Sequence, residues 1–163
     1  MGFGESPFPV HDSIKQSLCK NADKKSYLPT QGILALREQI SDFYKKIFKL
    51  NYSADQIIVA LGSKSLIFYS IAAVDGALLL PTPSWVSYQH QAYLVNKKII
   101  YMQTSPDSSY LLTPEQLLST LDRHFKDKNQ QKVLLLNYPS NPTGQSYSRS
   151  QLENLVPILR KNN

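Results

Sequence analysis

The turn Asn141–Gly144, with the sequence Asn-Pro-Thr-Gly, is the segment of this chain best suited to bind a ligand. It follows Val133–Leu136, an apolar run typical of a buried strand, and precedes Ser148, whose spacing to Gln151 predicts a helix N-terminus. Open α/β sheets bind ligands in the crevice at the carboxyl ends of their strands. An asparagine there can orient a ligand through hydrogen bonds, or it can simply order the loop through an Asx-turn.

A second candidate is the turn Gly62-Ser63-Lys64, which lies between a strand-like segment and a helix-like segment. Glycine lets the backbone approach an anion, and a helix N-terminus supplies N–H groups and a positive dipole end. A glycine turn before a helix is also a common structural feature, so both interpretations stay open. A Walker A phosphate loop does not fit, because Lys64 does not directly follow the glycine and the earlier glycine is missing.

Three further segments contain residues suited to binding. Trp85, the only tryptophan, lies in Pro81–Tyr88 after a strand-like run; its indole can stack on a flat ligand, although a lone tryptophan is usually a core residue. Tyr27 lies in the loop Ser26–Gly32, which precedes a long amphipathic segment. Gly4 lies in an N-terminal arm that contains further glycine and proline residues. No single one of these segments decides a function.

Taken in order, these segments resemble the motifs of the class I/II (fold type I) aminotransferases, which use pyridoxal 5'-phosphate (PLP). The resemblance runs from about residue 4 to residue 163 and depends on the order of the motifs along the chain. It implies a set of cofactor-binding residues: Gly62, Ser63 and Lys64 for the phosphate, Trp85 for stacking on the pyridine ring, and Asn141 for a hydrogen bond to the phenolic oxygen.

The same resemblance implies the partners of this chain. The family tyrosine at the position of Tyr27 reaches the phosphate of the neighbouring subunit, so Tyr27 is expected to act across a homodimer. The family glycine at the position of Gly4 lies near the substrate carboxylate. The implied substrates are an amino acid and a 2-oxo acid, and the sequence does not show which amino acid is the donor.

The family's Schiff-base lysine has no counterpart in these 163 residues, and neither has the aspartate that pairs with the pyridinium nitrogen. Lys64 is expected at the phosphate end, away from the aldehyde, so we assign no catalytic residue in this chain. Two alternatives to an aminotransferase portion stay open. One is a catalytically inert truncated fragment or homologue, and the other is a nucleotide-binding doubly wound domain that uses the Gly62 turn.

Composition limits the other partners. The net charge is +6, and the lysine pairs are spread along the chain without an arginine-rich or aromatic-interleaved patch, so nucleic-acid binding is not predicted. His11, His90 and His124 are isolated from one another, and none has metal-ligand spacing to an acidic or cysteine partner, so no metal site is predicted. The sequence contains neither an apolar run long enough to cross a membrane nor a charged-then-apolar leader, which predicts no membrane partner and a cytoplasmic location.

Alternating strands and helices must position these residues. The pattern predicts strands at residues 57–60, 77–80, 99–102 and 133–136, and helices at 11–21, 33–50, 63–73, 85–94, and from 113 and 148 onward. Wholly apolar strands alternating with helices predict an α/β fold with three layers and a mainly parallel sheet. We expect one partial PLP-binding large domain over residues 1–163, with an irregular arm at 1–10. Pro157 is expected to kink or shorten the last helix.

Overall fold

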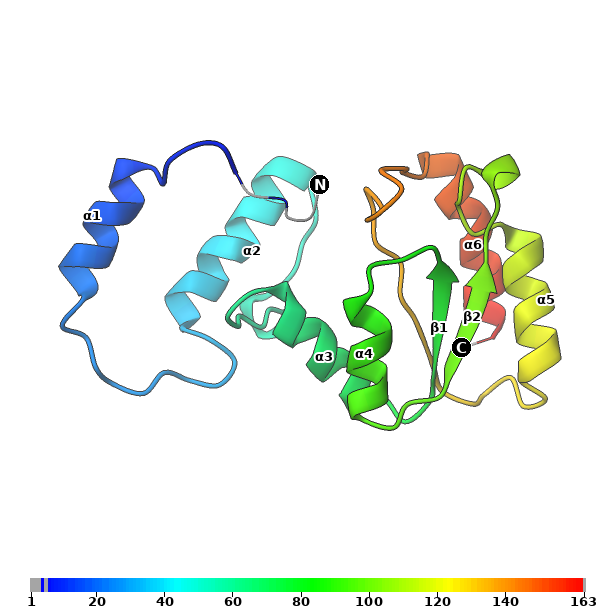
Figure 1. Cartoon of the computed structure of the whole chain (residues 1–163). Coiled ribbons are helices and arrows are strands. Elements are labelled where there is room, and N and C mark those ends of the chain that lie inside the picture. Colours follow the sequence, from blue (N-terminus) through cyan, green and yellow to red (C-terminus); the bar gives the residue numbers. More distant parts are fainter. Residues whose placement is uncertain (1–3, 5, 163) are drawn as a thin grey trace. The chain divides into compact units, whose positions relative to one another are not determined.

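A computed structural model describes residue 4 and residues 6–162 of the chain (Figure 1). The chain divides into two compact units, Met1–Val59 and Ala60–Asn163. The expectation that residues 1–163 form one partial domain stays a prediction.

The first unit contains the helices α1 (Asp12–Asn21) and α2 (Leu34–Phe48) and the short 3-10 helix η1 (Ala54–Gln56). Both helices lie where the hydrophobic periodicity predicts them. No residue of α1 is buried, and the only buried residue of α2 is Arg37. The Arg37 guanidinium donates hydrogen bonds to the Gly32 carbonyl at 3.2 Å and to the Ala54 carbonyl at 2.6 Å, so it connects two loops of this unit.

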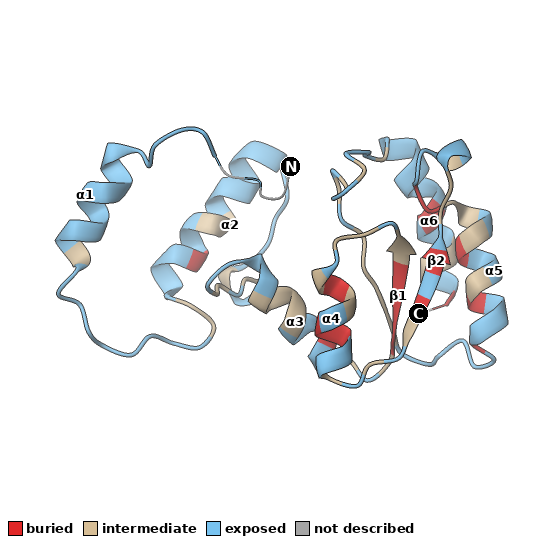
Figure 2. Cartoon of the chain, viewed as in Figure 1, coloured by how far each residue is buried: buried red, intermediate tan, exposed pale blue. Residues whose placement is uncertain are grey.

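The second unit is built on a parallel sheet of three strands: β1 (Ala77–Thr82), β2 (Ile99–Gln103) and β3 (Lys132–Leu134). The strand order is β2-β1-β3, so β1 is central, and Figure 2 shows it as a buried strand. Leu78 pairs in register with Ile99 on one side and with Val133 on the other. The predicted α/β class and the parallel sheet are confirmed.

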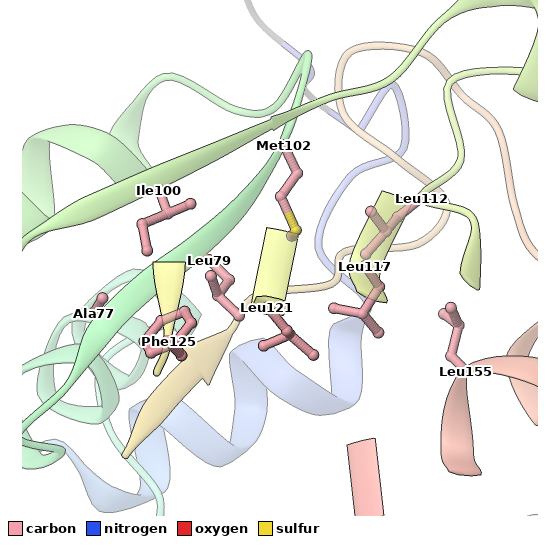
Figure 3. Packing of buried hydrophobic residues seen from close by; sticks show 9 residues of the cluster. All are labelled: Ala77, Leu79, Ile100, Met102, Leu112, Leu117, Leu121, Phe125 and Leu155. Carbon is pink, nitrogen blue, oxygen red and sulfur yellow. The ribbon is translucent and has the colours of Figure 1, made fainter. Parts of the chain in front are cut away.

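Helices cover both faces of this sheet, because successive side chains of a strand point in opposite directions. Helices α5 (Pro114–His124) and α6 (Arg149–Lys161) contribute to one cluster of buried residues (Figure 3): Ala77, Leu79, Ile100, Met102, Leu112, Leu117, Leu121, Phe125 and Leu155. Helices α3 (Ser63–Ala73) and α4 (Ser87–Leu94) contribute to the cluster of the other face: Ile71, Leu78, Leu80, Tyr88 and Ala92. These are the three predicted layers. A short 3-10 helix, η2 (Pro106–Ser108), lies between β2 and α5.

The helix starts of α5 and α6 follow their sequence signals. Thr113 and Gln116 form a capping box at α5, and Ser148 and Gln151 form one at α6. Each pair satisfies two backbone N–H groups that a helix start leaves without partners. The predicted shortening at Pro157 is wrong, because α6 continues through it to Lys161.

The predicted strand at residues 57–60 is not a strand in the structure. The Val59 N–H donates instead to the Gln31 carbonyl at 3.0 Å, inside the first unit. A strand needs a neighbouring strand to satisfy its backbone, and the apolar run alone does not supply one. The described sheet therefore has three strands where the sequence predicted four.

Candidate functional site

The Gly62 turn has the features of an anion-binding site. Gly62 is the N-cap of α3 with φ 83° and ψ 158°, and no side chain caps this helix start. A Cβ at Gly62 would meet no atom within 4 Å, so the space in front of the turn is open. Gly62, Ser63 and Lys64 are all exposed. The free N–H groups and the positive end of the helix dipole can therefore face an anion in solvent.

Trp85 lies beside this turn. The Lys64 ammonium stands 4.9 Å from the centroid of the Trp85 ring, within the range of a cation–π contact. Trp85 is partly buried on the face of the sheet that α3 and α4 cover, and it packs edge-to-face on Tyr88 with ring centroids 5.4 Å apart. The structure thus joins two motifs, the Gly62 turn and the Trp85 segment, which the sequence placed in separate loops.

Asn141 lies in a turn that backbone hydrogen bonds close. The Ser140 N–H donates to the Gln145 carbonyl at 2.8 Å, and the Gly144 N–H donates to the Ser140 carbonyl at 2.7 Å. Because the backbone itself closes the turn, the Asn141 side chain, which is exposed, is available for another partner.

Asn141 also lines a narrow crevice of about 20 Å³ together with Pro83, Tyr88 and Tyr110. This volume suits one water molecule, so a larger ligand would bind across the mouth of the crevice. Tyr88 contacts Trp85 and also lines this crevice, which makes it the connection between the aromatic segment and the asparagine turn.

Two tyrosines support the asparagine turn. The rings of Tyr138 and Tyr147 meet edge-to-face with centroids 4.4 Å apart, and the Tyr147 hydroxyl donates to the Leu112 carbonyl at 2.9 Å. Burial is the main cause that raises the pKa of both phenols above the ordinary value. Both side chains therefore remain neutral at physiological pH.

The remaining two predicted residues lie in the first unit. Tyr27 is fully exposed, and Gly4 is exposed with no atom within 4 Å of a Cβ placed on it. Both residues lie in the first unit, whereas the Gly62, Trp85 and Asn141 loops lie in the second, and the site roles of Tyr27 and Gly4 remain predictions.

Another cavity lies at the opposite end of the sheet. It has a volume of about 650 Å³, and its lining includes Val74, which precedes β1, and Lys132, which begins β3. Ligands of parallel α/β sheets bind at the carboxyl ends of the strands, so we place the candidate site at the three loops and not in this cavity. In the part of the chain that the structure describes, no cluster of metal-ligating side chains occurs and no helix is long and apolar enough to cross a membrane.

Sequence reasoning missed Tyr88, Tyr147 and Gln91. The buried Gln91 side chain donates to the Lys64 carbonyl at 2.8 Å and so links α4 to the first turn of α3. Tyr147 and Gln91 belong to no local motif, and their contacts join segments far apart in sequence. The one available signal for Tyr88 was its place as the last residue of the Pro81–Tyr88 segment.

A parallel sheet with an open glycine turn, an aromatic segment and an asparagine turn near its strand ends is typical of proteins that bind a phosphorylated ligand there. The chain belongs to the family "Aminotransferase class I and II", whose sequence profile matches residues 2–163. The resemblance that the motifs indicated is confirmed.

Known relatives and structures agree with this assignment. The chain is 30% identical over 168 residues to an aspartate aminotransferase of Bacillus sp. strain YM-2. It is 32% identical over 166 residues to a probable aspartate/prephenate aminotransferase of Rickettsia felis. The crystal structure of the aspartate aminotransferase from Rhizobium meliloti superposes with a TM-score of 0.85 at 28% identity, covering 97% of this chain and 39% of that one.

The match covers nearly all of this chain and a smaller part of its relatives. It includes 100% of this chain and 41% of the Bacillus protein, and 99% of this chain and 39% of the Rickettsia protein. The chain therefore spans about two fifths of the length of these curated relatives.

Proposed function

We propose that this chain is the PLP-binding portion of an aminotransferase, which moves an amino group between an amino acid and a 2-oxo acid. The observation that carries the proposal is the continuous set of contacts from the anion turn to the asparagine turn. Lys64 contacts Trp85, Trp85 contacts Tyr88, and Tyr88 lines the crevice of Asn141. These three kinds of group match the phosphate, the flat ring and the phenolic oxygen of PLP.

The residues present fit PLP by their chemistry. The uncapped start of α3 at Gly62 offers N–H donors for the phosphate, and the Lys64 ammonium adds a positive charge. Trp85 would present its ring to the pyridine, and the Asn141 amide would donate to the phenolic oxygen and stabilise its anionic form. PLP, when bound, serves as an electron sink for reactions at the α-carbon of an amino acid.

Calorimetric titration with PLP tests the proposal. We expect Asn141→Ala to weaken PLP binding by about tenfold or more, because one hydrogen bond to a charged oxygen is lost. The matched control is Asn154→Ala, which removes an exposed amide from α6 away from the site and should leave the affinity unchanged. Pyridoxal, which lacks the phosphate, should bind more weakly than PLP. Equal affinities for both ligands would contradict the role of the Gly62 turn.

We further propose that the polypeptide of these 163 residues does not transaminate on its own, because none of its lysines matches the family's Schiff-base position. Borohydride reduction with PLP present, followed by peptide mass analysis, tests this expectation. Scattered, sub-stoichiometric labelling of surface lysines agrees with it. A stoichiometric adduct on one lysine, together with turnover that depends on an amino acid, would contradict it and make that lysine catalytic.

We also propose a cytoplasmic homodimer in which Tyr27 reaches the phosphate turn of the partner. The full exposure of Tyr27 supports this, as do the exposed apolar side chains of α2, among them Phe43 and Ile47. Sedimentation at high protein concentration checks the assembly. A clean monomer would count against the dimer, and a dimer with Tyr27 far from the partner's Gly62 turn would refute the role across subunits.

A further inference from the structure

Gln91 is a buried polar residue that no motif explains. It lies within α4, and its side chain is only 7% exposed. Its Nε2 donates to the Lys64 carbonyl at 2.8 Å, across the interface between α4 and the first turn of α3. This direction is fixed by chemistry, because a flipped amide would place the Gln91 oxygen against another carbonyl oxygen.

The other end of the same amide has no partner. Gln91 Oε1 is buried and accepts no hydrogen bond from any residue that the structure describes. An unpaired buried oxygen destabilises a fold, and an apolar side chain of the same size would avoid that cost. Stability alone therefore does not explain a glutamine at this position, and the bond to Lys64 is its distinctive contribution.

This bond completes a closed set of contacts around the candidate site. Gln91 holds the backbone of Lys64, and the Lys64 ammonium lies 4.9 Å from the Trp85 ring centroid. Trp85 packs on Tyr88, which lies three residues before Gln91 in α4, so the set begins and ends on the same helix. Loss of the Gln91 bond would remove this hydrogen bond between the first turn of α3 and α4.

We propose that Gln91 is a positioning residue, which fixes the position of the anion turn at Gly62–Lys64 relative to the aromatic face of Trp85. The proposal rests on the proposed function, since it deepens the description of the same cofactor site. Gln91 donates its hydrogen bond to the Lys64 carbonyl. It acts through Lys64, by fixing the direction from which the ammonium approaches the ring.

The test compares two matched substitutions in α4. Gln91→Met keeps the size of the side chain and removes both the bond to Lys64 and the unpaired oxygen. Gln89→Met is the control, because the Gln89 oxygen accepts from the hydroxyl of Tyr101, a residue of β2, at 3.1 Å. Trp85 is the only tryptophan, so its fluorescence reports the site directly.

Two measurements are made on each protein. Acrylamide quenching of Trp85 needs no ligand, and we expect its constant to rise about twofold in Gln91→Met as the Lys64 side chain leaves the ring. Titration with PLP should show an affinity about fivefold to tenfold weaker in Gln91→Met, because the anion turn is then no longer preorganised for the ligand. Gln89→Met should match the wild-type protein in both measurements, and the unfolding midpoint of Gln91→Met should not fall in proportion to its loss of affinity.

The outcomes separate this inference from the proposed function. If Gln91→Met has the same quenching constant and the same PLP affinity as the wild-type protein, the positioning role of Gln91 is wrong. Equal changes in Gln91→Met and Gln89→Met would also overturn this role. If the wild-type protein fails to bind PLP, the proposed function fails for this chain, and the quenching result alone decides the role of Gln91. If Gln91→Met does not fold, Gln91→Leu replaces it, because a leucine side chain is apolar and has no donor for the Lys64 carbonyl. The same rise in quenching is expected there, and its absence would overturn the proposal.

Discussion

Replacement of Gly62 by alanine separates backbone strain from steric overlap at the candidate anion turn. A Cβ at this position would meet no atom within 4 Å, so the steric cost is close to zero. The backbone conformation, with φ 83° and ψ 158°, lies in a region that is almost restricted to glycine and that costs other residues about 1–3 kcal/mol. Strain alone therefore sets the expected loss of stability.

At about 2 kcal/mol, this loss corresponds to a fall of about 4–8 °C in the unfolding midpoint for a chain of this length. Thermal unfolding followed by circular dichroism measures it, and a titration with inorganic phosphate measures the accompanying loss of anion binding. Gly4→Ala is the control: its Cβ would also meet no atom within 4 Å, and it should change the stability by less than about 0.5 kcal/mol. If Gly62→Ala unfolds like the wild-type protein and binds phosphate equally well, the turn does not need its glycine and the reasoning is wrong.

Three further predictions concern the second unit. Leu117→Ala should lower the free energy of unfolding, measured by urea denaturation, by about 2–5 kcal/mol, because Leu117 is fully buried. The control Leu118→Ala, at an exposed position, should change this free energy by less than about 0.5 kcal/mol. Similar losses in both variants would contradict the packing of α5. Tyr147→Phe should lower the free energy of unfolding by about 1–2 kcal/mol, because the buried Leu112 carbonyl loses its 2.9 Å hydrogen bond. An unchanged free energy would show that another donor replaces the Tyr147 hydroxyl. Burial raises the pKa of Tyr138, so its contribution to stability is complete below about pH 10 and is lost as the pH rises further. Tyr138→Phe should therefore show a shallower loss of stability between about pH 9 and about pH 11, and an equally steep loss would assign the effect to other groups.

The elements that the sequence predicts well have strong local signals. The helix starts at Thr113 and Ser148 are fixed by capping pairs within three residues, and both appear as predicted. The central strand at Ala77–Thr82 contains a continuous apolar run, and such a run is typical of a strand covered on both faces. Local chemistry decides these features, so a single sequence is enough to identify them.

The features that the sequence does not predict depend on partners far along the chain. The run at residues 57–60 is apolar enough for a strand, but its pairing depends on a neighbouring backbone that the run itself cannot specify. The bond from Tyr147 to Leu112 joins residues 35 positions apart, and the bond from Gln91 to Lys64 joins residues 27 positions apart. The motifs named the three loops of the candidate site, and only the fold shows which residues connect them.

The most direct test of the proposed site is a crystal structure of this chain with PLP. We predict the phosphate at the N–H groups of Gly62, Ser63 and Lys64, the pyridine ring against Trp85, and the Asn141 amide within hydrogen-bond distance of the phenolic oxygen. A phosphate bound away from the start of α3, or a ring on the face of the sheet opposite Asn141, would contradict the assignment of this chain as a PLP-binding portion.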